Sequence, residues 1–216
     1  MQISKETLAI LKNFASINGN IKVEVGSQLK TISVARNVLA EASVTENFPK
    51  EFCIYNLGEF LNCVTLFEEA DLEFGDQMVT ISANGTKLNY KYSSPSIIVS
   101  PEKPIKLEDA PDVKFTLTAE DLGKLNRGAG AVNGDTIKIT CSGNEITLEA
   151  LDDRTTVNTF KMKIAAENAG NGEFRVKRAN MNFIAGNDYE VSIWQKGISC
   201  FQGTAIPVKY YVALEK

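Results

Sequence analysis

Apolar residues recur along the chain with two different periods, which predict a mixture of helices and short strands. In residues 4–17, SKETLAILKNFASI, a step of about 100° per residue places Ile3, Ile10, Leu11 and Phe14 on one face. Lys5, Lys12 and Ser16 then fall nearly opposite, with the two lysines two turns apart. Ser4 is suited to cap the first turn. The pattern therefore predicts an amphipathic helix with a basic polar face.

Short alternating runs surround a second predicted helix. Residues 56–67, NLGEFLNCVTLF, have a helical period and Asn56 as a candidate cap. Asn84-Gly85 is typical of a hairpin turn. Alternation predicts strands at residues 21–25, 30–35, 37–44, 71–75, 78–85 and 86–93.

Residues 94–112, SPSIIVSPEKPIKLEDAPD, differ from the segments on either side, because four of the chain's six prolines lie there. Proline disfavours both helix interiors and interior strands, so this segment is predicted to be an extended connector. The predicted organisation is an N-terminal domain at 1–98, a connector at 99–112 and a C-terminal domain at 113–216.

After the connector the first pattern begins again. The segment LTAEDLGKL, from residue 117, aligns with ISKETLAIL, from residue 3, and both lead helices end near Asn-Gly, at residues 18–19 and 133–134. Residues 176–186, VKRANMNFIAG, occupy the place of the second helix. Strands are predicted at 135–141, 144–150, 157–165, 188–197, 199–203 and 207–214. The sequence thus predicts an α+β protein of two similar domains, each with two helices packed on antiparallel sheet.

Composition excludes several function classes. The chain of 216 residues has a net charge of −4 and no histidine, which removes the commonest general base and most zinc sites. Its four cysteines form no CxxC pair, so we expect reduced and mostly buried thiols, as in a cytoplasm. The N-terminus lacks a signal-peptide core, and no apolar run approaches the roughly 20 residues that span a bilayer. Any DNA contact of such an acidic chain must be local and weak.

The segment at 117–135, LTAEDLGKLNRGAGAVNGD, combines two basic residues, Lys124 and Arg127, with glycines at 123, 128 and 130. The glycines do not fit a phosphate-binding loop, because no Lys-Ser/Thr follows them and they follow a helix cap instead of a strand. Acidic clusters at 68–71 and 152–153 are typical of solvated turns. No nucleophile elbow, metal-ligand spacing or cofactor motif supports an enzyme, and no cofactor is expected.

Basic residues recur on the predicted helices. Lys5, Lys12, Lys124 and Arg127 lie on the two lead helices, and Lys177 and Arg178 begin the fourth. A solvated helix face is the plain alternative for each of them. The acids of the lead helices, Glu6, Glu120 and Asp121, lie in the first turns, where they suit the helix dipole.

Across its full length the chain resembles the sliding clamps of T-even-like bacteriophages. The resemblance is carried by SKETLAILKNFASIN, VSPEKPI, RANMNF, SIWQKG and YYVALE, in this order and spacing. It implies a DNA-clamp fold and a homotrimeric ring whose helices line a central hole. Such a ring encircles duplex DNA without sequence preference, tethers the replicative DNA polymerase, and is loaded by a separate ATP-dependent clamp loader. It also implies location in the cytoplasm of the infected bacterial host.

The resemblance further implies three kinds of site. The predicted DNA-facing residues are Lys5, Lys12, Lys124, Arg127, Lys177 and Arg178. An outer apolar pocket for partner peptides, beneath the connector, is assigned by position to Leu39, Ala40, Ile105, Leu107, Trp194, Tyr211 and Val212. The subunit interface is expected to pair edge strands at 86–93 and 157–165.

Three rival functions differ from the clamp in what they require. A structural trimeric phage β-rich protein without DNA contact would scatter its basic residues over outer surfaces. A single-strand binding module would interleave aromatic and basic residues, whereas Phe14 and Phe183 fall on apolar faces. A hydrolase would need a catalytic site that the sequence does not contain.

Overall fold

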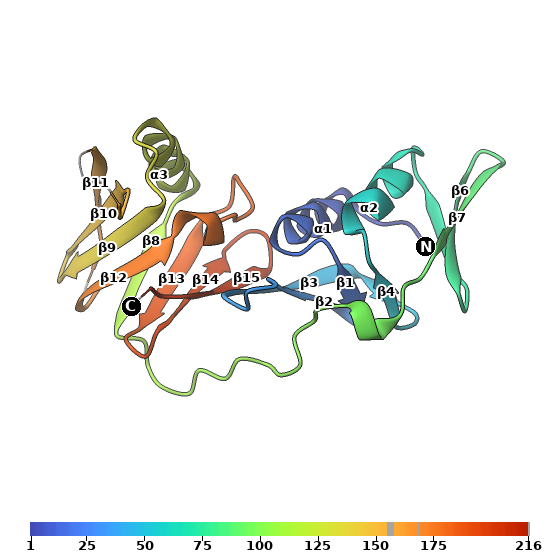
Figure 1. Ribbon diagram of the computed structural model, residues 1–216, viewed down its shortest axis with the longest axis horizontal. Helices are drawn as coiled ribbons and strands as arrows, with labels where there is room; N and C mark the ends of the chain where they lie inside the picture. The colour runs from blue at the N-terminus through green and yellow to red at the C-terminus, as the bar shows by residue number, and fades with distance from the viewer. Residues whose placement is uncertain (155–157, 168, 216) are drawn as a thin grey trace. The chain divides into compact units, whose positions relative to one another are not determined.

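A computed structural model describes residues 1–154, 158–167 and 169–215 (Figure 1). The chain divides into two compact units, Met1–Pro104 and Ile105–Lys216. Each unit combines a long lead helix with antiparallel strands. The α+β class predicted from the two periods is therefore confirmed.

Unit 1 begins with the predicted lead helix and contains the predicted second one. Ser4 caps the first helix, since its hydroxyl accepts a hydrogen bond from the Thr7 N–H, and Asn56 caps the second in the same way through Glu59. The helices are α1 (Lys5–Ile17) and α2 (Leu57–Thr65). The strands are β1 (Ile21–Val23), β2 (Gly26–Ile32), β3 (Val38–Phe48), β4 (Phe52–Ile54), β5 (Asp71–Phe74), β6 (Met78–Ala83) and β7 (Thr86–Lys91).

The strands of unit 1 pair in three groups: β1 with β4, β2 with β3, and β5 with β6 and β7. Asn84 and Gly85 join β6 to β7 with φ angles of 49° and 79°, the left-handed values that a tight hairpin turn requires. Ile10, Leu11 and Phe14 of α1 are buried, and α1 packs on α2 and β3. The predicted apolar face of the lead helix is thus the face that meets the core.

Unit 2 begins with β8 (Val113–Leu117), which leads into the helix α3 (Ala119–Ala131). The remaining strands are β9 (Thr136–Ser142), β10 (Glu145–Leu151), β11 (Thr159–Ala165), β12 (Asn171–Lys177), β13 (Tyr189–Trp194), β14 (Ile198–Gly203) and β15 (Val208–Ala213). They pair antiparallel in the orders β11-β10-β9-β12 and β15-β14-β13-β8. Helix α3 packs on β10 and β11.

The fourth helix predicted at 176–186 is absent, and the described residues contain three α-helices. Strand β12 continues through Lys177, and only the 3-10 turn η2 (Arg178–Asn180) follows it. The backbone of Ile184 bonds to side chains: its N–H donates to the Tyr210 hydroxyl, and its carbonyl accepts from the Tyr189 hydroxyl. Phe183 packs against both tyrosines and Phe201, with ring centroids 4.5–5.4 Å apart. Tertiary contacts therefore replace the helix that the local pattern predicts.

The sequence analysis did not predict three of the observed strands, β4, β8 and β12. Strand β4 has only three residues, and β12 contains Asn171 and Gly172, which are typical of turns. The connector holds a 3-10 turn, η1 (Pro95–Ile97), and residues 98–112 form neither helix nor strand. Within the described residues, no helix is long and apolar enough to cross a membrane.

Candidate functional site

The two lysines of α1 lie on its solvent-exposed side. Lys5 and Lys12 are both exposed, opposite the buried Ile10 and Phe14. Neither lysine forms an ion pair with another residue in the described part of the chain. Glu6 in the first turn is the single acid of the helix. The face therefore offers two exposed positive charges that no described acidic side chain pairs with.

A buried carboxylate fixes the start of α1. Glu46 on β3 is 8% exposed and accepts hydrogen bonds from the Ser4 N–H and the Thr7 hydroxyl, both at 2.5 Å. Burial alone would raise the pKa of Glu46, but these hydrogen bonds outweigh it and hold the pKa below its ordinary value. This residue was missed from sequence, although it alternates in step with the apolar Ala42, Val44 and Phe48, which indicates an inward side chain.

Helix α3 presents the second basic face. Leu122, Leu125 and Ala129 are buried, whereas Lys124 and Arg127 are exposed. Thr118 caps the helix by accepting from the Asp121 N–H. No ion pair is found for Lys124 or Arg127 among residues 1–154, 158–167 and 169–215. The arrangement is the same as on α1: acids in the first turn, and unpaired cations further along the exposed face.

The three glycines of α3 meet three different neighbours. A Cβ atom built on Gly123 would lie 3.4 Å from Nη1 of Arg127, and one on Gly130 would lie 3.5 Å from Nη2 of Arg178. Both distances are ordinary contacts, so the two guanidinium groups rest beside the helix backbone. A Cβ atom on Gly128 would instead fall inside the contact distance of the Phe160 ring on β11. Only Gly128 is therefore required by close packing.

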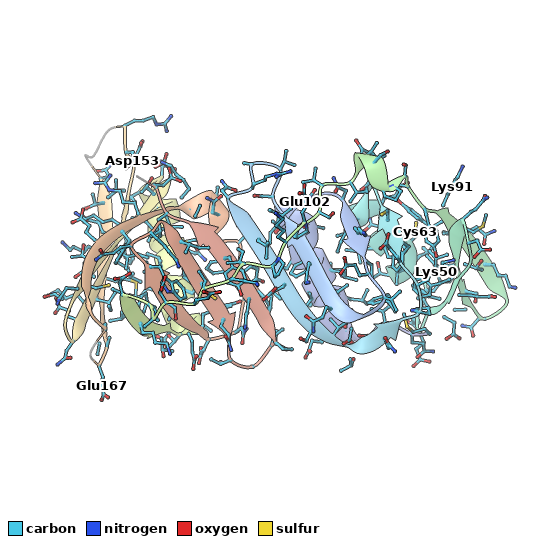
Figure 2. The ribbon with its side chains drawn as sticks, turned by 90° about the horizontal axis from the view of Figure 1, so that it is seen from below. Lys50, Cys63, Lys91, Glu102, Asp153 and Glu167 are labelled. Carbon is cyan, nitrogen blue, oxygen red and sulfur yellow. The ribbon has the colours of Figure 1, made fainter. Side chains whose placement is uncertain are left out.

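The two basic residues predicted to begin a fourth helix have different surroundings. Lys177, at the end of β12, donates to Oδ2 of Asp153 and to the Thr136 hydroxyl, both at 2.8 Å. This hydrogen bond raises the pKa of Lys177 and lowers the pKa of Asp153, whose side chain is labelled in Figure 2. Arg178 instead points to α3, where Nη2 donates to the Asn126 carbonyl at 3.4 Å. Arg178 thus joins the basic face of α3, whereas Lys177 is already paired.

The residues assigned to the partner pocket divide between the two faces of their sheets. Ala40 has the same parity along β3 as Glu46, which bonds to α1, so Ala40 faces the core and is fully buried. Leu39 points to the opposite face. On β15, Val212 is fully buried, and Tyr211 lies on the opposite, half-exposed face. Leu39 is only 7% exposed, so among these four residues Tyr211 is the one that a partner can reach.

Trp194 contacts the connector. Its indole N–H donates to the Asp109 carbonyl at 2.9 Å, and the neighbouring Lys196 forms an ion pair with the Asp109 carboxylate at 3.1 Å. Trp194 is 8% exposed. Ile105 and Leu107, further back on the connector, are half-buried. The tryptophan thus holds the end of the connector within unit 2.

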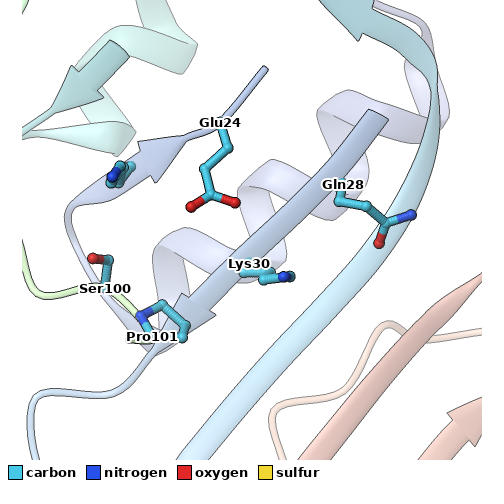
Figure 3. A pocket seen from close by; sticks show the side chains of 6 residues that line it. Glu24, Gln28, Lys30, Ser100 and Pro101 are labelled. Carbon is cyan, nitrogen blue, oxygen red and sulfur yellow. The ribbon is translucent and has the colours of Figure 1, made fainter. Parts of the chain in front are cut away.

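Two hollows lie near the connector's ends. The first, in unit 1, measures about 40 Å³ and is lined by Lys22, Glu24, Gln28, Lys30, Ser100 and Pro101 (Figure 3). About 10–15 Å³ of such space holds one water molecule, so this hollow has room for a few waters. The second, in unit 2, measures about 580 Å³ between β12 and the β13–β14 turn. Its lining includes Phe174, Leu214, Arg175 and Lys196.

The strands predicted for the subunit interface lie at sheet edges. Strand β7 is at one edge of the β5-β6-β7 group, and β11 is at one edge of the β11-β10-β9-β12 group. Their outward residues are mostly exposed. The predicted segment 157–165 begins at Val157, which lies outside the described residues. Each strand has one row of backbone groups that its own sheet leaves unpaired.

The described residues contain no candidate metal site. No group of three or more His, Cys, Asp or Glu side chains there is placed to hold a metal ion. None of the four cysteines forms a disulfide, and Cys53, Cys141 and Cys200 are buried. The exposed faces of α1 and α3 instead carry cations, which suit binding to an anionic partner.

Comparisons with known proteins agree with this arrangement. Residues 4–100 match the family model of the DNA polymerase processivity factor, and residues 114–216 match that of the C-terminal domain of the gp45 sliding clamp. The chain is 31% identical to the sliding clamp of Vibrio phage KVP40, with 100% of this chain and 99% of that protein covered. It is 32% identical to the sliding clamp of Enterobacteria phage T4, over 100% of this chain and 97% of that protein.

Solved structures share the fold at lower identity. The PCNA2-PCNA3 complex of Sulfolobus tokodaii matches with a TM-score of 0.74 and 13% identity, covering 97% of this chain and 96% of that one. The proliferating cellular nuclear antigen of Entamoeba histolytica matches with a TM-score of 0.72 and 16% identity, covering 97% and 94%. The DNA-clamp fold expected from the resemblance is confirmed. The chain belongs to the sliding-clamp family of bacteriophage DNA polymerase processivity factors.

Proposed function

We propose that three copies of the chain close into a ring around duplex DNA and tether the replicative DNA polymerase. One observation carries the proposal: exposed cations on α1 and α3 have no ion-pair partner among the described residues, in a chain of net charge −4. The family's description as a DNA polymerase processivity factor supports the polymerase as partner. Members of this family are not enzymes, so the function is mechanical.

Weak phosphate contacts suit a ring that must stay on DNA and still slide. Duplex DNA carries one negative charge per about 1.7 Å of its axis, and affinity rises with the number of phosphates neutralised. Lys5, Lys12, Lys124 and Arg127 would contact phosphates without reading sequence. Ring closure would supply retention, so a small number of unpaired cations is sufficient.

Partner tails would dock on the sheet faces that point away from the helices. Tyr211 is half-exposed and Ile105 and Leu107 lie half-buried on the connector, so these three are the accessible members of the predicted pocket. Aromatic side chains such as Tyr211 are common anchors at interfaces. The A. fulgidus clamp is described in complex with the C-terminal region of FEN-1, so a peptide tail is a ligand of that protein.

Ring assembly would use the free edges of β7 and β11. Pairing two different strands head to tail generates a closed ring when the rotation per copy is one third of a turn. Because the sequence contains no nucleotide-binding motif, a separate ATP-dependent clamp loader would open the ring. The site of action would be the cytoplasm of the infected host.

A charge-reversal pair tests the DNA contact. Lys124→Glu with Arg127→Glu changes the net charge by −4, and so does the matched control Lys50→Glu with Arg154→Glu. The control residues lie outside the helices and strands, where they form ion pairs with Asp76 and Asp152. We expect loader-dependent processive synthesis to fall sharply only in the α3 variant. Equal processivity in both variants would contradict DNA contact by α3 and favour a structural trimer without DNA contact.

A further inference from the structure

The end of α1 holds the beginning of the connector through two asparagine side chains. The Asn18 amide nitrogen donates to the Val99 carbonyl at 3.0 Å, and the Asn20 amide oxygen accepts from the Val99 N–H at 3.0 Å. Both backbone groups of Val99 are therefore bonded to side chains that immediately follow α1. This resembles the pairing of a residue in a sheet, with asparagine amides in place of a neighbouring strand.

The two asparagines are themselves tightly held. Asn18 ends α1, where its backbone N–H donates to the Phe14 carbonyl at 2.9 Å, and it is 3% exposed. Its amide nitrogen also donates to the Ile32 carbonyl at 2.9 Å, and its amide oxygen accepts from the Asn20 N–H at 3.1 Å. Both polar atoms of this buried amide are thus satisfied, which makes Asn18 a rigid attachment point.

The far end of the connector is held in the same manner within unit 2. Asp109 is bonded by Trp194 and Lys196, and the Asp112 N–H donates to the Ile193 carbonyl at 2.9 Å. The Asp112 carboxylate also accepts from the Gln195 N–H at 2.8 Å. Backbone and side chains of β13 and the turn after it therefore secure residues 109–112.

Between these ends the connector is held weakly. Over residues 100–108, all of them described, the single polar contact is the ion pair of Arg36 with Glu102 at 3.6 Å (Figure 2). Both side chains of this pair are more than two-thirds exposed, so it stabilises the segment little. The connector is thus fixed at Val99 and at Asp109, and it carries Ile105 and Leu107 in the span between.

We propose that Asn18 and Asn20 are positioning residues for partner binding: they fix the start of the connector so that its apolar residues are presented to a partner's tail. The inference rests on the proposed function, because it assumes that the connector binds such tails. It goes further by assigning this task to the end of α1, the helix whose exposed face carries Lys5 and Lys12.

The test compares three variants of the full-length chain. Asn20→Ala removes the acceptor of the Val99 N–H, Asn20→Asp keeps an acceptor oxygen at the same place, and Ser16→Ala is the control. Ser16 also lies at the end of α1, but its hydroxyl donates to the Asn13 carbonyl and does not bond the connector. For each variant we measure hydrogen exchange at the Val99 amide and the affinity for a synthetic peptide with the sequence of the polymerase's tail.

We expect Asn20→Ala to speed hydrogen exchange at the Val99 amide by roughly three- to tenfold and to lower the affinity for the peptide by a similar factor. Asn20→Asp should restore both, and Ser16→Ala should change neither. Unchanged exchange in Asn20→Ala would overturn the anchor, and faster exchange with unchanged peptide affinity would overturn the positioning role. If the wild-type chain does not bind the peptide, the proposed partner site fails, whereas the exchange data still decide whether Asn20 anchors the connector.

Discussion

The glycines of α3 give a sharp prediction because one of the three is required by packing and the others are not. Alanine at an interior helix position is about 0.5–1 kcal/mol more favourable than glycine. At Gly123 the new methyl group would lie 3.4 Å from the Arg127 guanidinium, an ordinary contact. We therefore expect Gly123→Ala to stabilise unit 2 by roughly the full propensity difference, about 0.5–1 kcal/mol.

At Gly128 the same change opposes packing. The methyl group would overlap Cγ, Cδ1 and Cε1 of Phe160, so the ring or the helix must move. Overfilling a packed site costs about 1–3 kcal/mol, which exceeds the propensity gain. We expect Gly128→Ala to be about 1–3 kcal/mol less stable than Gly123→Ala.

Urea unfolding at fixed protein concentration measures both effects, because ring assembly would otherwise shift the apparent stability. The single tryptophan, Trp194, is buried in unit 2 and reports on the unit that contains α3. In a Phe160→Ala background the clash is gone, so Gly128→Ala should become stabilising, with a coupling of at least about 1 kcal/mol. Equal effects of Gly123→Ala and Gly128→Ala, or no coupling to Phe160, would refute the reasoning.

Four further predictions address the other contacts. Glu46→Ala should destabilise unit 1 by about 1–3 kcal/mol, because it leaves the Ser4 N–H and the Thr7 hydroxyl without their acceptor. The loss is measured as weaker protection of the α1 amides from hydrogen exchange. The folded-state pKa of Glu46 lies below its ordinary value of 4.5, so the ionised carboxylate stabilises the folded state above pH 4.5. This stabilisation is lost as the pH falls through the folded-state pKa. If Glu46→Gln left the pH dependence of stability in acid unchanged, the prediction would be wrong. Leu107→Ala should lower the affinity for the polymerase tail peptide without changing the sedimentation of the assembled ring. Dissociation of the ring would contradict a role confined to partner binding. Lys177→Met should cost less than about 1 kcal/mol, since its pair with Asp153 is partly exposed, and the loss should shrink further in high salt.

Local pattern was sufficient for the parts of the fold that local chemistry decides. The period of the apolar residues and the Ser4 cap predict α1, the repeat of this pattern from residue 117 predicts α3, and both helices are present. The Asn84-Gly85 turn is likewise set by two adjacent residues that accept left-handed backbone angles. These features need no partner from elsewhere in the chain.

The sequence-based predictions were wrong or incomplete where residues far away in the sequence determine the local structure. The backbone of Ile184 bonds to the hydroxyls of Tyr189 and Tyr210, which come from two later strands, and a predicted helix is replaced by a short turn. Arg178 reaches α3 only because β12 ends beside that helix, which no local pattern indicates. Glu46 is an intermediate case. Alternation along β3 predicts that its side chain points inward, but its hydrogen-bond partners Ser4 and Thr7, some 40 residues earlier, cannot be predicted from the local sequence.

Topological retention on circular DNA tests the central claim most directly. The chain is loaded onto a nicked circle with its cognate clamp loader and ATP, the complex is isolated, and the circle is then cut once. A closed ring that holds DNA by encirclement is retained before the cut and released after it. Retention that persists on the linear DNA would show that ordinary affinity holds the chain, and it would contradict the account.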